Sequence, residues 1–288
     1  MVLTSPAKSC TIECSFATVD ESQIGMPPFP PTEELIRNME TIIYGEVLGA
    51  GLLADIALPP SDVTAPYPVI LGVHGGRWHY SSRNQLGAAI DVNQWTEHGF
   101  FAMSIEYRLV TCTPAPACYQ DTLCAIRWVH ANADRYQLDL SRIYLTGMSA
   151  GGHLVSLAAT LGEGPFMNTG GWEGESCDFR ASISVSGAYD LLSLDWACGW
   201  ITPGVPWDEA RRQASPIEHV SDSSKPMLLF HSDDDPSVPV SQADRMAETL
   251  TEKGVHHRYL HYTDRGHMVL TRDFVIEESL NFIHDLES

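Results

Sequence analysis

The pentapeptide Gly-Met-Ser-Ala-Gly at residues 147–151 constrains this chain more than any other stretch. It follows an apolar run at residues 142–146 and precedes a helix-like stretch at residues 152–160. A serine flanked by glycines at a strand-to-helix junction is typical of a nucleophile elbow, a turn too sharp for larger neighbours. The same string also occurs by chance at ordinary helix starts, so its weight comes from the strand and the helix around it. We therefore expect a strand–turn–helix unit that presents Ser149 as a nucleophile, with the positive end of the helix dipole aimed at the site.

The rest of the chain alternates between strand-like and helix-like segments. Apolar positions recur at helical spacing over residues 120–132 and 241–253, and a further helix is expected over 273–286. The candidate strands are short, and the later ones are almost continuously apolar, as expected for parallel strands covered on both faces. There are eight of them, at residues 41–47, 52–58, 68–74, 100–105, 142–146, 181–185, 226–231 and 257–262. We predict an α/β fold with a mostly parallel eight-stranded sheet and helices on both faces.

Two segments do not fit the alternation. Residues 1–39 are irregular and can contribute to a lid, whereas residues 40–288 form the predicted main domain. Residues 188–215 are a predicted insertion, and a Gly-rich loop runs over residues 162–177.

Large aromatic side chains in such irregular parts need something to bury them. They either pack as a small cluster under a long loop or wall an apolar acyl or aryl pocket as a small, loop-rich lid. We predict that four of the seven tryptophans line the substrate pocket, namely Trp78, Trp172, Trp196 and Trp200.

Charge and hydropathy exclude several classes of partner. The 17 basic and 37 acidic residues give a net charge of −20, which argues against nucleic acid or an anionic membrane. No run approaches the ~20 apolar residues of a membrane span. The first ten residues have neither a basic leader nor an apolar core, so we expect a cytoplasmic protein unless a leader has been removed. The oligomeric state stays open, a dimer included.

The seven cysteines do not form a metal-binding pattern, because none lies at zinc spacing to histidines. We expect neither a metal nor a cofactor. Buried, reduced thiols are the favoured interpretation. Disulfides remain open for three pairs: Cys112 with Cys118, and more weakly Cys10 with Cys14 and Cys177 with Cys198, which leaves Cys124 unpaired.

A serine nucleophile needs donors for the oxyanion, a base and an acid. The strand-like run at residues 68–74 leads into the segment His74-Gly-Gly-Arg-Trp78, whose small residues expose backbone N–H groups. Together with the N–H of Ala150 these groups predict an oxyanion hole, although a Gly-rich turn without a function would have the same sequence pattern. We expect His74 itself to be structural.

The acid and the base are expected after the last two strands. Three consecutive aspartates follow His231, and we favour Asp235 because the next residues, 236–239, should dock Val238 on the core. Asp233 is the second choice and Asp190 a weaker rival. We favour His267 as the base, because it lies on a Gly-preceded loop before the last helix. The three residues then occur along the chain in the order Ser149, Asp235, His267. This order is typical of the α/β-hydrolase architecture, whereas the two serine-protease folds have other orders.

With these motifs the chain resembles the esterase/lipase group of the α/β-hydrolases, related to hormone-sensitive lipase and to feruloyl and acetylxylan esterases. The matching motifs run from about residue 50 to the C-terminus. They are His74–Trp78, Glu106-Tyr-Arg-Leu109, Gly147–His153, Ser215-Pro216, the stretch from His231 through Asp235 to Pro239, and Gly266-His267. The resemblance implies a serine carboxylesterase with Ser149, Asp235 and His267 as catalytic residues and with Gly76, Arg77 and Ala150 as oxyanion donors. The open loops with their tryptophans suggest small acyl or aromatic esters as substrates rather than long lipid chains.

The chain departs from this group at two positions. Arg77 replaces the usual third glycine of the oxyanion motif, and Met148 replaces an aspartate common in lipase-like relatives. The form His-Gly-Gly-x-Trp also resembles kynurenine formamidases, so a formamidase or another amidase is an alternative. A prolyl-oligopeptidase-type peptidase is disfavoured because no propeller-like domain is attached. A non-catalytic receptor of the same fold is disfavoured because no member of the triad is missing.

Overall fold

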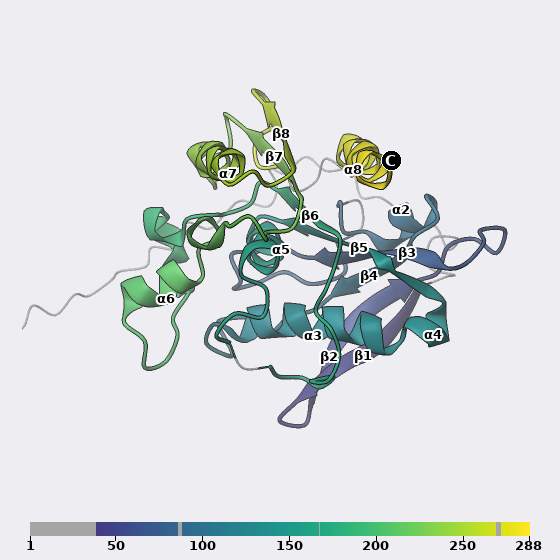
Figure 1. Cartoon of the computed structure of the whole chain (residues 1–288). Helices are drawn as coiled ribbons and strands as arrows, with labels where there is room; N and C mark the ends of the chain where they lie inside the picture. The colour runs from purple at the N-terminus through teal and green to yellow at the C-terminus, as the bar shows by residue number, and fades with distance from the viewer. Residues whose placement is uncertain (1–38, 86–87, 167, 269–271) are drawn as a thin grey trace, which may run out of the picture. The chain divides into compact units, whose positions relative to one another are not determined.

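Eight strands of the described residues pair into one sheet in the order β1-β2-β4-β3-β5-β6-β7-β8 (Figure 1). The computed structural model describes residues 39–85, 88–166, 168–268 and 272–288. The strand pairs β1/β2 and β2/β4 are antiparallel, and every later neighbour pair is parallel. The strands are β1 (Met39–Val47), β2 (Ala50–Ala57), β3 (Tyr67–Val73), β4 (Phe101–Ile105), β5 (Leu138–Met148), β6 (Ala181–Val185), β7 (Met227–Ser232) and β8 (His257–Tyr262).

Helices cover both faces of this sheet, which has a hydrophobic core on each side (Figure 1). One core receives α3 (Ala117–Ala131), α5 (Ala150–Leu161) and α7 (Ser241–Glu252). The other receives α2 (Val92–Thr96) and α8 (Arg272–Glu287).

Successive side chains of a strand point to opposite faces. In β3, Val69, Leu71 and Val73 accordingly enter the first core and Ile70 enters the second. The strands β6 and β7 are buried along their whole length, which explains why their sequences are rich in apolar residues and carry no Asp, Glu, Lys or Arg.

The predicted mostly parallel sheet is confirmed, with a strand at each of the eight expected places. The strand β5 is longer than expected, since it begins at Leu138. The helix α2 was not expected. It is only five residues long and is capped at its N-terminus by Asp91, whose carboxylate accepts a hydrogen bond from the Asn93 N–H.

The predicted insertion at residues 188–215 is mostly short helices rather than open loop. It holds two 3₁₀ helices, η2 (Leu191–Ser193) and η3 (Asp195–Gly199), and the helix α6 (Trp207–Gln213). Its buried apolar residues join the core beneath α3, α5 and α7; they include Leu191, Leu194, Ala197, Trp200 and Ala210. The remaining short helices are α4 (Ala133–Tyr136) and η4 (Pro216–His219). The expected irregular segment 1–39 lies outside the described residues except for Met39, which opens β1.

The described cysteines are all free thiols, so the pairs Cys112–Cys118 and Cys177–Cys198 are not bridged. Cys118 is buried within α3, whereas Cys112 is exposed. Cys177 accepts a hydrogen bond from Arg127, and Cys198 is exposed. Cys10 and Cys14 lie outside the described residues.

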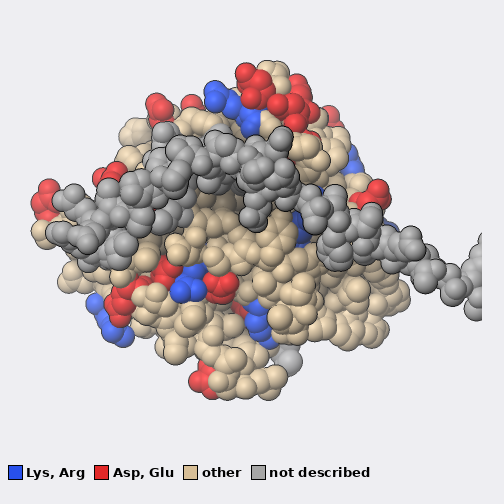
Figure 2. All heavy atoms as spheres, turned by 180° about the vertical axis from the view of Figure 1, so that it is seen from behind, with Lys and Arg blue, Asp and Glu red and all other residues tan. Residues whose placement is uncertain are grey.

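The basic side chains form no continuous patch on the visible part of the face in Figure 2, where several of them lie against acidic side chains. Among the residues that the structure describes, no helix has the length and apolar character needed to cross a membrane.

One buried ion pair ties the end of β4 to α3. The Arg108 guanidinium contacts both carboxylate oxygens of Asp121 at 2.7–3.0 Å, and the Arg108 backbone N–H donates to the same carboxylate at 2.8 Å. The Asp121 side chain is 0% exposed. Removing one partner of such a pair leaves the other charge without compensation in a desolvated place.

We predict that Asp121→Ala lowers the free energy of unfolding by about 3–5 kcal/mol, because Arg108 then loses its buried partner. Urea denaturation of the purified protein measures this. The control is Asp178→Ala, which removes the exposed partner of Lys225 and should cost less than about 1 kcal/mol. Equal effects of the two substitutions would contradict the prediction.

Candidate active site

The three predicted catalytic residues each follow the carboxyl end of a strand. Ser149 follows β5, Asp235 follows β7, and His267 follows β8. The loop of residues 74–78 follows β3, which pairs directly with β5. Since the carboxyl ends of parallel strands share one edge, segments far apart in sequence meet there.

Ser149 stands at a turn that only glycine neighbours permit. Its backbone has φ 53° and ψ −114°, an unusual conformation for a residue with a side chain. A Cβ added to Gly147 would lie 2.4 Å from the Gly151 carbonyl oxygen, and one added to Gly151 would lie 2.0 Å from the Val73 oxygen. The Ser149 N–H donates to the Val185 carbonyl at 2.8 Å, which fixes the turn against β6. This is the geometry that the pentapeptide predicted.

Asp235 is bonded on both carboxylate oxygens. Its Oδ2 lies 2.8 Å from Nδ1 of His267, and its Oδ1 accepts the N–H groups of Ser237 at 2.8 Å and Val238 at 2.9 Å. Burial alone would raise the pKa of the Asp235 carboxyl. The hydrogen bond and charge of His267, together with the two backbone donors, outweigh burial and lower this pKa. Asp235 is therefore held as a carboxylate that faces the Nδ1 side of the imidazole.

The rival aspartates point elsewhere. Asp233 is exposed and pairs with His261 at 2.6 Å. Asp234 accepts hydrogen bonds from Ser232 and from the Gly266 N–H. Asp190 forms an ion pair with Arg245 at 2.7 Å. Of these four aspartates, only Asp235 bonds His267.

Ser149 and His267 line one cavity of about 170 Å³. Its lining combines the oxyanion loop, the elbow and the loops of the acid and the base. The described lining residues are Gly75, Gly76, Arg77, Tyr80, Ser81, Gln85, Met148, Ser149, Ser237 and His267.

The predicted oxyanion loop has three consecutive residues with positive φ: Gly76 (102°), Arg77 (52°) and Trp78 (63°). A Cβ on Gly76 would lie 2.1 Å from the Tyr80 carbonyl oxygen, so only glycine fits there. Among the described residues, no acceptor lies on the N–H groups of Gly76 and Arg77. Ala150 opens α5, so its N–H belongs to the first turn, which the helix itself leaves unpaired. None of the three predicted donors thus has a backbone acceptor within the described part of the chain.

Two buried aromatic contacts hold this loop. His74 stacks on Tyr107 with ring centroids 4.0 Å apart, and the Tyr107 hydroxyl lies 3.2 and 3.1 Å from the carbonyl oxygens of His74 and Gly75. Further along, Trp78 Nε1 donates to Nδ1 of His153 at 3.2 Å. His74 is therefore structural, as expected.

His153 is a neutral side chain that links two neighbours through hydrogen bonds. Burial lowers the pKa of His153 to about 4, partly opposed by its hydrogen bond to the Ala214 carbonyl oxygen. Since Nδ1 accepts from Trp78, Nε2 carries the proton and donates to Ala214 at 2.7 Å. The sequence motif Gly147–His153 contained this residue but gave no role for it.

The four tryptophans do not lie where the sequence predicted, because none is among the described lining residues of the cavity. Trp78 and Trp200 are both 0% exposed and pack edge to face at 5.3 Å. Trp172 donates through Nε1 to the Tyr44 carbonyl oxygen, on β1. Trp196 stands behind the cavity wall, where its Nε1 donates to the Ser237 carbonyl oxygen at 2.9 Å.

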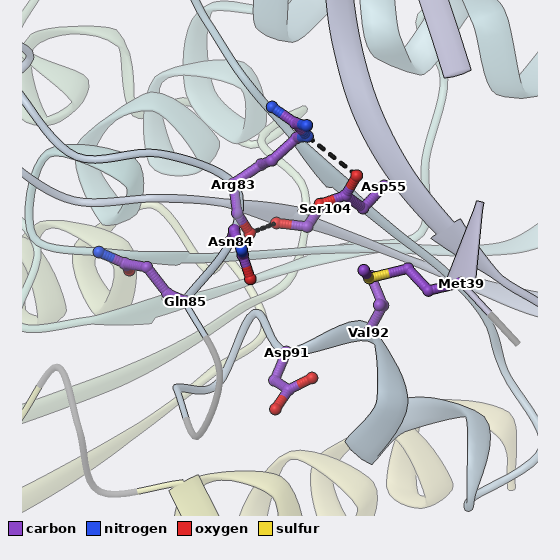
Figure 3. Close-up of a pocket in the computed structure, with 8 residues that line it drawn as sticks. All are labelled: Met39, Asp55, Arg83, Asn84, Gln85, Asp91, Val92 and Ser104. Atoms are coloured by element: carbon purple, nitrogen blue, oxygen red, sulfur yellow. Dashed lines mark hydrogen bonds and ion pairs between the residues drawn. The ribbon is translucent and has the colours of Figure 1, made fainter. Parts of the chain in front are cut away.

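Part of the wall was not expected from the sequence, namely Tyr80, Ser81 and Gln85. Their loop is anchored by Arg83, which contacts Asp55 and Glu106 at 3.0 Å each. Figure 3 shows Arg83 turned toward Asp55, and the Ser104 hydroxyl bonded to the Arg83 backbone. No periodic or short-range signal marks such a tether, because its partners lie on β2 and β4.

A pH series on Asp235→Asn tests the described carboxylate geometry. The folded-state pKa of Asp235 is lowered, so its carboxylate stabilises the fold above the unfolded pKa of about 4. This stabilisation is lost as the pH falls through the folded value. We predict that the variant is less stable than the unmodified protein by about 1–3 kcal/mol at pH 7, and that the difference shrinks below about pH 4.

Urea denaturation at several pH values measures this difference. Asp233→Asn, which changes an exposed carboxylate beside another histidine, serves as the control. A stability difference that stays constant from pH 7 to pH 3 would speak against the assigned bonding of Asp235.

Known proteins resemble this chain in sequence and in fold. Esterase LipC of Mycobacterium tuberculosis is 29% identical over 73% of this chain and 54% of its own length. The probable carboxylic ester hydrolase LipM of the same organism is 30% identical over 73% of this chain and 51% of its length. The chain thus spans about half the length of these curated relatives.

The fold matches a solved structure described as a truncated form of a carbohydrate esterase from gut microbiota. The TM-score is 0.79 at 23% identity, and the match covers 90% of this chain and 99% of the other. This likeness and the sheet order confirm the predicted α/β-hydrolase fold. The resemblance to α/β-hydrolase esterases is confirmed as well. The model of one family matches residues 54–250, most of the chain, and the chain therefore belongs to the BD-FAE family.

Proposed function

We propose that this chain is a serine carboxylesterase that hydrolyses small acyl or aromatic esters through an acyl-enzyme on Ser149. The observation that carries the proposal is the 2.8 Å hydrogen bond between Asp235 and His267, in a cavity whose wall also includes Ser149. An acid, an imidazole and a strained serine from three separate loops meet at one edge of the sheet. Such convergence is the requirement for nucleophilic catalysis by a hydroxyl group.

In the proposed reaction, Asp235 accepts a hydrogen bond from the Nδ1–H of His267 and so holds the tautomer whose unprotonated Nε2 can act as a base. His267 removes the proton of Ser149 Oγ as this oxygen attacks the ester carbonyl carbon. The negative charge that develops on the carbonyl oxygen is stabilised by the N–H groups of Gly76, Arg77 and Ala150. His267 then returns its proton to the departing alcohol, which leaves an acyl group on Ser149.

Water completes the cycle. His267 takes a proton from water as the water oxygen attacks the acyl carbon, and the proton then passes to Ser149 Oγ as the carboxylic acid departs. No metal or redox group takes part in these steps. The same residues could cleave an activated amide, but a nitrogen leaving group must be protonated more completely before it departs.

The relatives support ester hydrolysis as the reaction but do not identify the substrate, since the names of LipC and LipM describe ester hydrolases. The small cavity supports a small substrate. One water needs roughly 10–15 Å³ of such space, so about 170 Å³ suits an acetate ester of a single aromatic ring.

We predict that Ser149→Ala and His267→Ala remove nearly all turnover of p-nitrophenyl acetate, and that Asp235→Asn lowers kcat by about 10⁴ because the imidazole is held in the wrong tautomer. Steady-state kinetics measure these losses. Asp233→Asn is the matched control in the same loop and should keep its activity, since Asp233 bonds His261 instead. Full activity of Ser149→Ala would end the proposal.

Covalent labelling separates an enzyme from a non-catalytic receptor of the same fold. A fluorophosphonate should add once to the unmodified protein, as read by intact mass, and not to Ser149→Ala. An unlabelled wild-type chain would show that Ser149 is not activated.

A substrate series tests the size of the acyl group and the choice between ester and amide. We predict that kcat/KM falls from p-nitrophenyl acetate and butyrate to the octanoate, because the longer chain exceeds the described cavity. N-formylkynurenine should be cleaved more slowly than p-nitrophenyl acetate. The reverse order for these last two compounds would favour the formamidase.

A further inference from the structure

Arg77 is an unusual residue for its position. Its backbone φ of 52° lies in the region that favours glycine, so a side chain is kept there under strain. The side chain is exposed and borders the cavity that holds Ser149 and His267. Strain of this kind persists where something else compensates for it, and such positions cluster at functional sites.

The guanidinium of Arg77 has no carboxylate partner among the described residues. Its polar contact among the described residues is the Ser237 hydroxyl at 3.5 Å, which is at the limit of a hydrogen bond. By contrast, eight other basic side chains of the described residues do form ion pairs, in a chain with 37 acidic groups. Of the described basic residues without an ion pair, Arg77 is the one that lines the cavity of Ser149 and His267.

Neighbouring groups orient this cation without neutralising it. The guanidinium carbon lies 5.4 Å from the centre of the Trp196 ring, a cation–π distance. Trp196 is itself fixed by the hydrogen bond from its Nε1 to the Ser237 carbonyl oxygen. The Arg77 side chain thus bridges the oxyanion loop and the loop that carries Asp235, with most of its N–H donors unused.

The rest of the cavity offers no competing charge. Among the described lining residues, Arg77 is the one with a permanent charge. The carboxylate of Asp235 is buried and already bonded on both oxygens. His79 beside Arg77 has a pKa lowered by burial and by the Arg77 charge, which keeps that imidazole neutral at neutral pH.

We propose that Arg77 binds an anionic group of the substrate, so that the preferred esters carry a free carboxylate in addition to the ester bond. A planar guanidinium with unused donors matches a carboxylate through two parallel hydrogen bonds. This inference rests on the proposed esterase function and adds a substrate class to it. In a protein of net charge −20, a local cation is also what allows an anion to approach the serine.

Matched pairs of esters test the inference, one pair for each side of the ester bond. On the alcohol side, the acetate ester of 4-hydroxybenzoate is compared with that of methyl 4-hydroxybenzoate. On the acyl side, monomethyl adipate is compared with methyl hexanoate. The measured quantity is the ratio of kcat/KM for the anionic ester to that for the neutral ester.

The ratio should fall about fivefold to tenfold in Arg77→Gln for at least one pair, because a charge-assisted contact is lost. Arg77→Lys should keep part of the preference, and added salt should lower it in the unmodified protein. A general loss of rate in either variant cancels in the ratio, since both esters of a pair use the same backbone donors.

Arg135→Gln is the control for the change in net charge. Arg135 is likewise exposed and lies over an aromatic ring, that of Tyr136, at 5.1 Å. It belongs to α4, before the amino end of β5, whereas Ser149 follows the carboxyl end of that strand. Its ratio should equal that of the unmodified protein.

The outcomes separate the two proposals. If the unmodified protein cleaves the neutral esters but Arg77→Gln leaves both ratios unchanged, the carboxylate site is refuted and the esterase stands. An equal fall in Arg135→Gln would also refute it, because the effect would then be one of overall charge. If the unmodified protein cleaves none of these esters, the esterase function fails and the inference fails with it.

Discussion

The close approach of α5 to the sheet is the constraint on which the rest of this structure depends. Gly147 and Gly151 have no room for a Cβ: one at Gly151 would lie 2.0 Å from the Val73 carbonyl oxygen. A side chain at either place would push the helix away from β3 and β5. The helix start would then no longer face the loop after β3, and in the proposed mechanism the Ala150 N–H could not share an oxyanion with Gly76 and Arg77. Packing and the candidate chemistry therefore have the same origin.

The histidines show how burial separates supporting from candidate catalytic groups. His74, His153 and His231 are buried, each has an imidazole nitrogen at a backbone carbonyl oxygen, and burial lowers the pKa of each. They are neutral parts of the scaffold near neutral pH. His267 differs because its side chain is partly exposed and bonds a carboxylate. With twelve histidines in the chain, composition could not distinguish these environments.

The sequence predicted the features that depend on local pattern. Unbroken apolar runs located the strands, and the elbow required two glycines at fixed spacing. The stretch 236–239, with a proline at each end, favoured Asp235 among the three aspartates, and Asp235 is hydrogen-bonded to His267 in the structure. Features that depend on distant partners were not predictable. The tether from Arg83 to Asp55 crosses strands, and the direction of the tryptophans is set by partners such as His153 and Tyr44. Loop aromatics look the same in sequence whether they fill a core or line a pocket.

Position 77 combines two demands that usually fall on different residues. Its backbone adopts the left-handed conformation, which the proposed mechanism needs for the N–H groups to serve the serine, and glycine meets that demand with least strain. Its side chain projects from the loop of residues 74–78, within reach of Trp196 and Ser237. A substituent there is fixed in place by the same turn. Under the two proposals, substrate selection and transition-state stabilisation depend on one loop, whose geometry depends on the contacts of Tyr107 and His153.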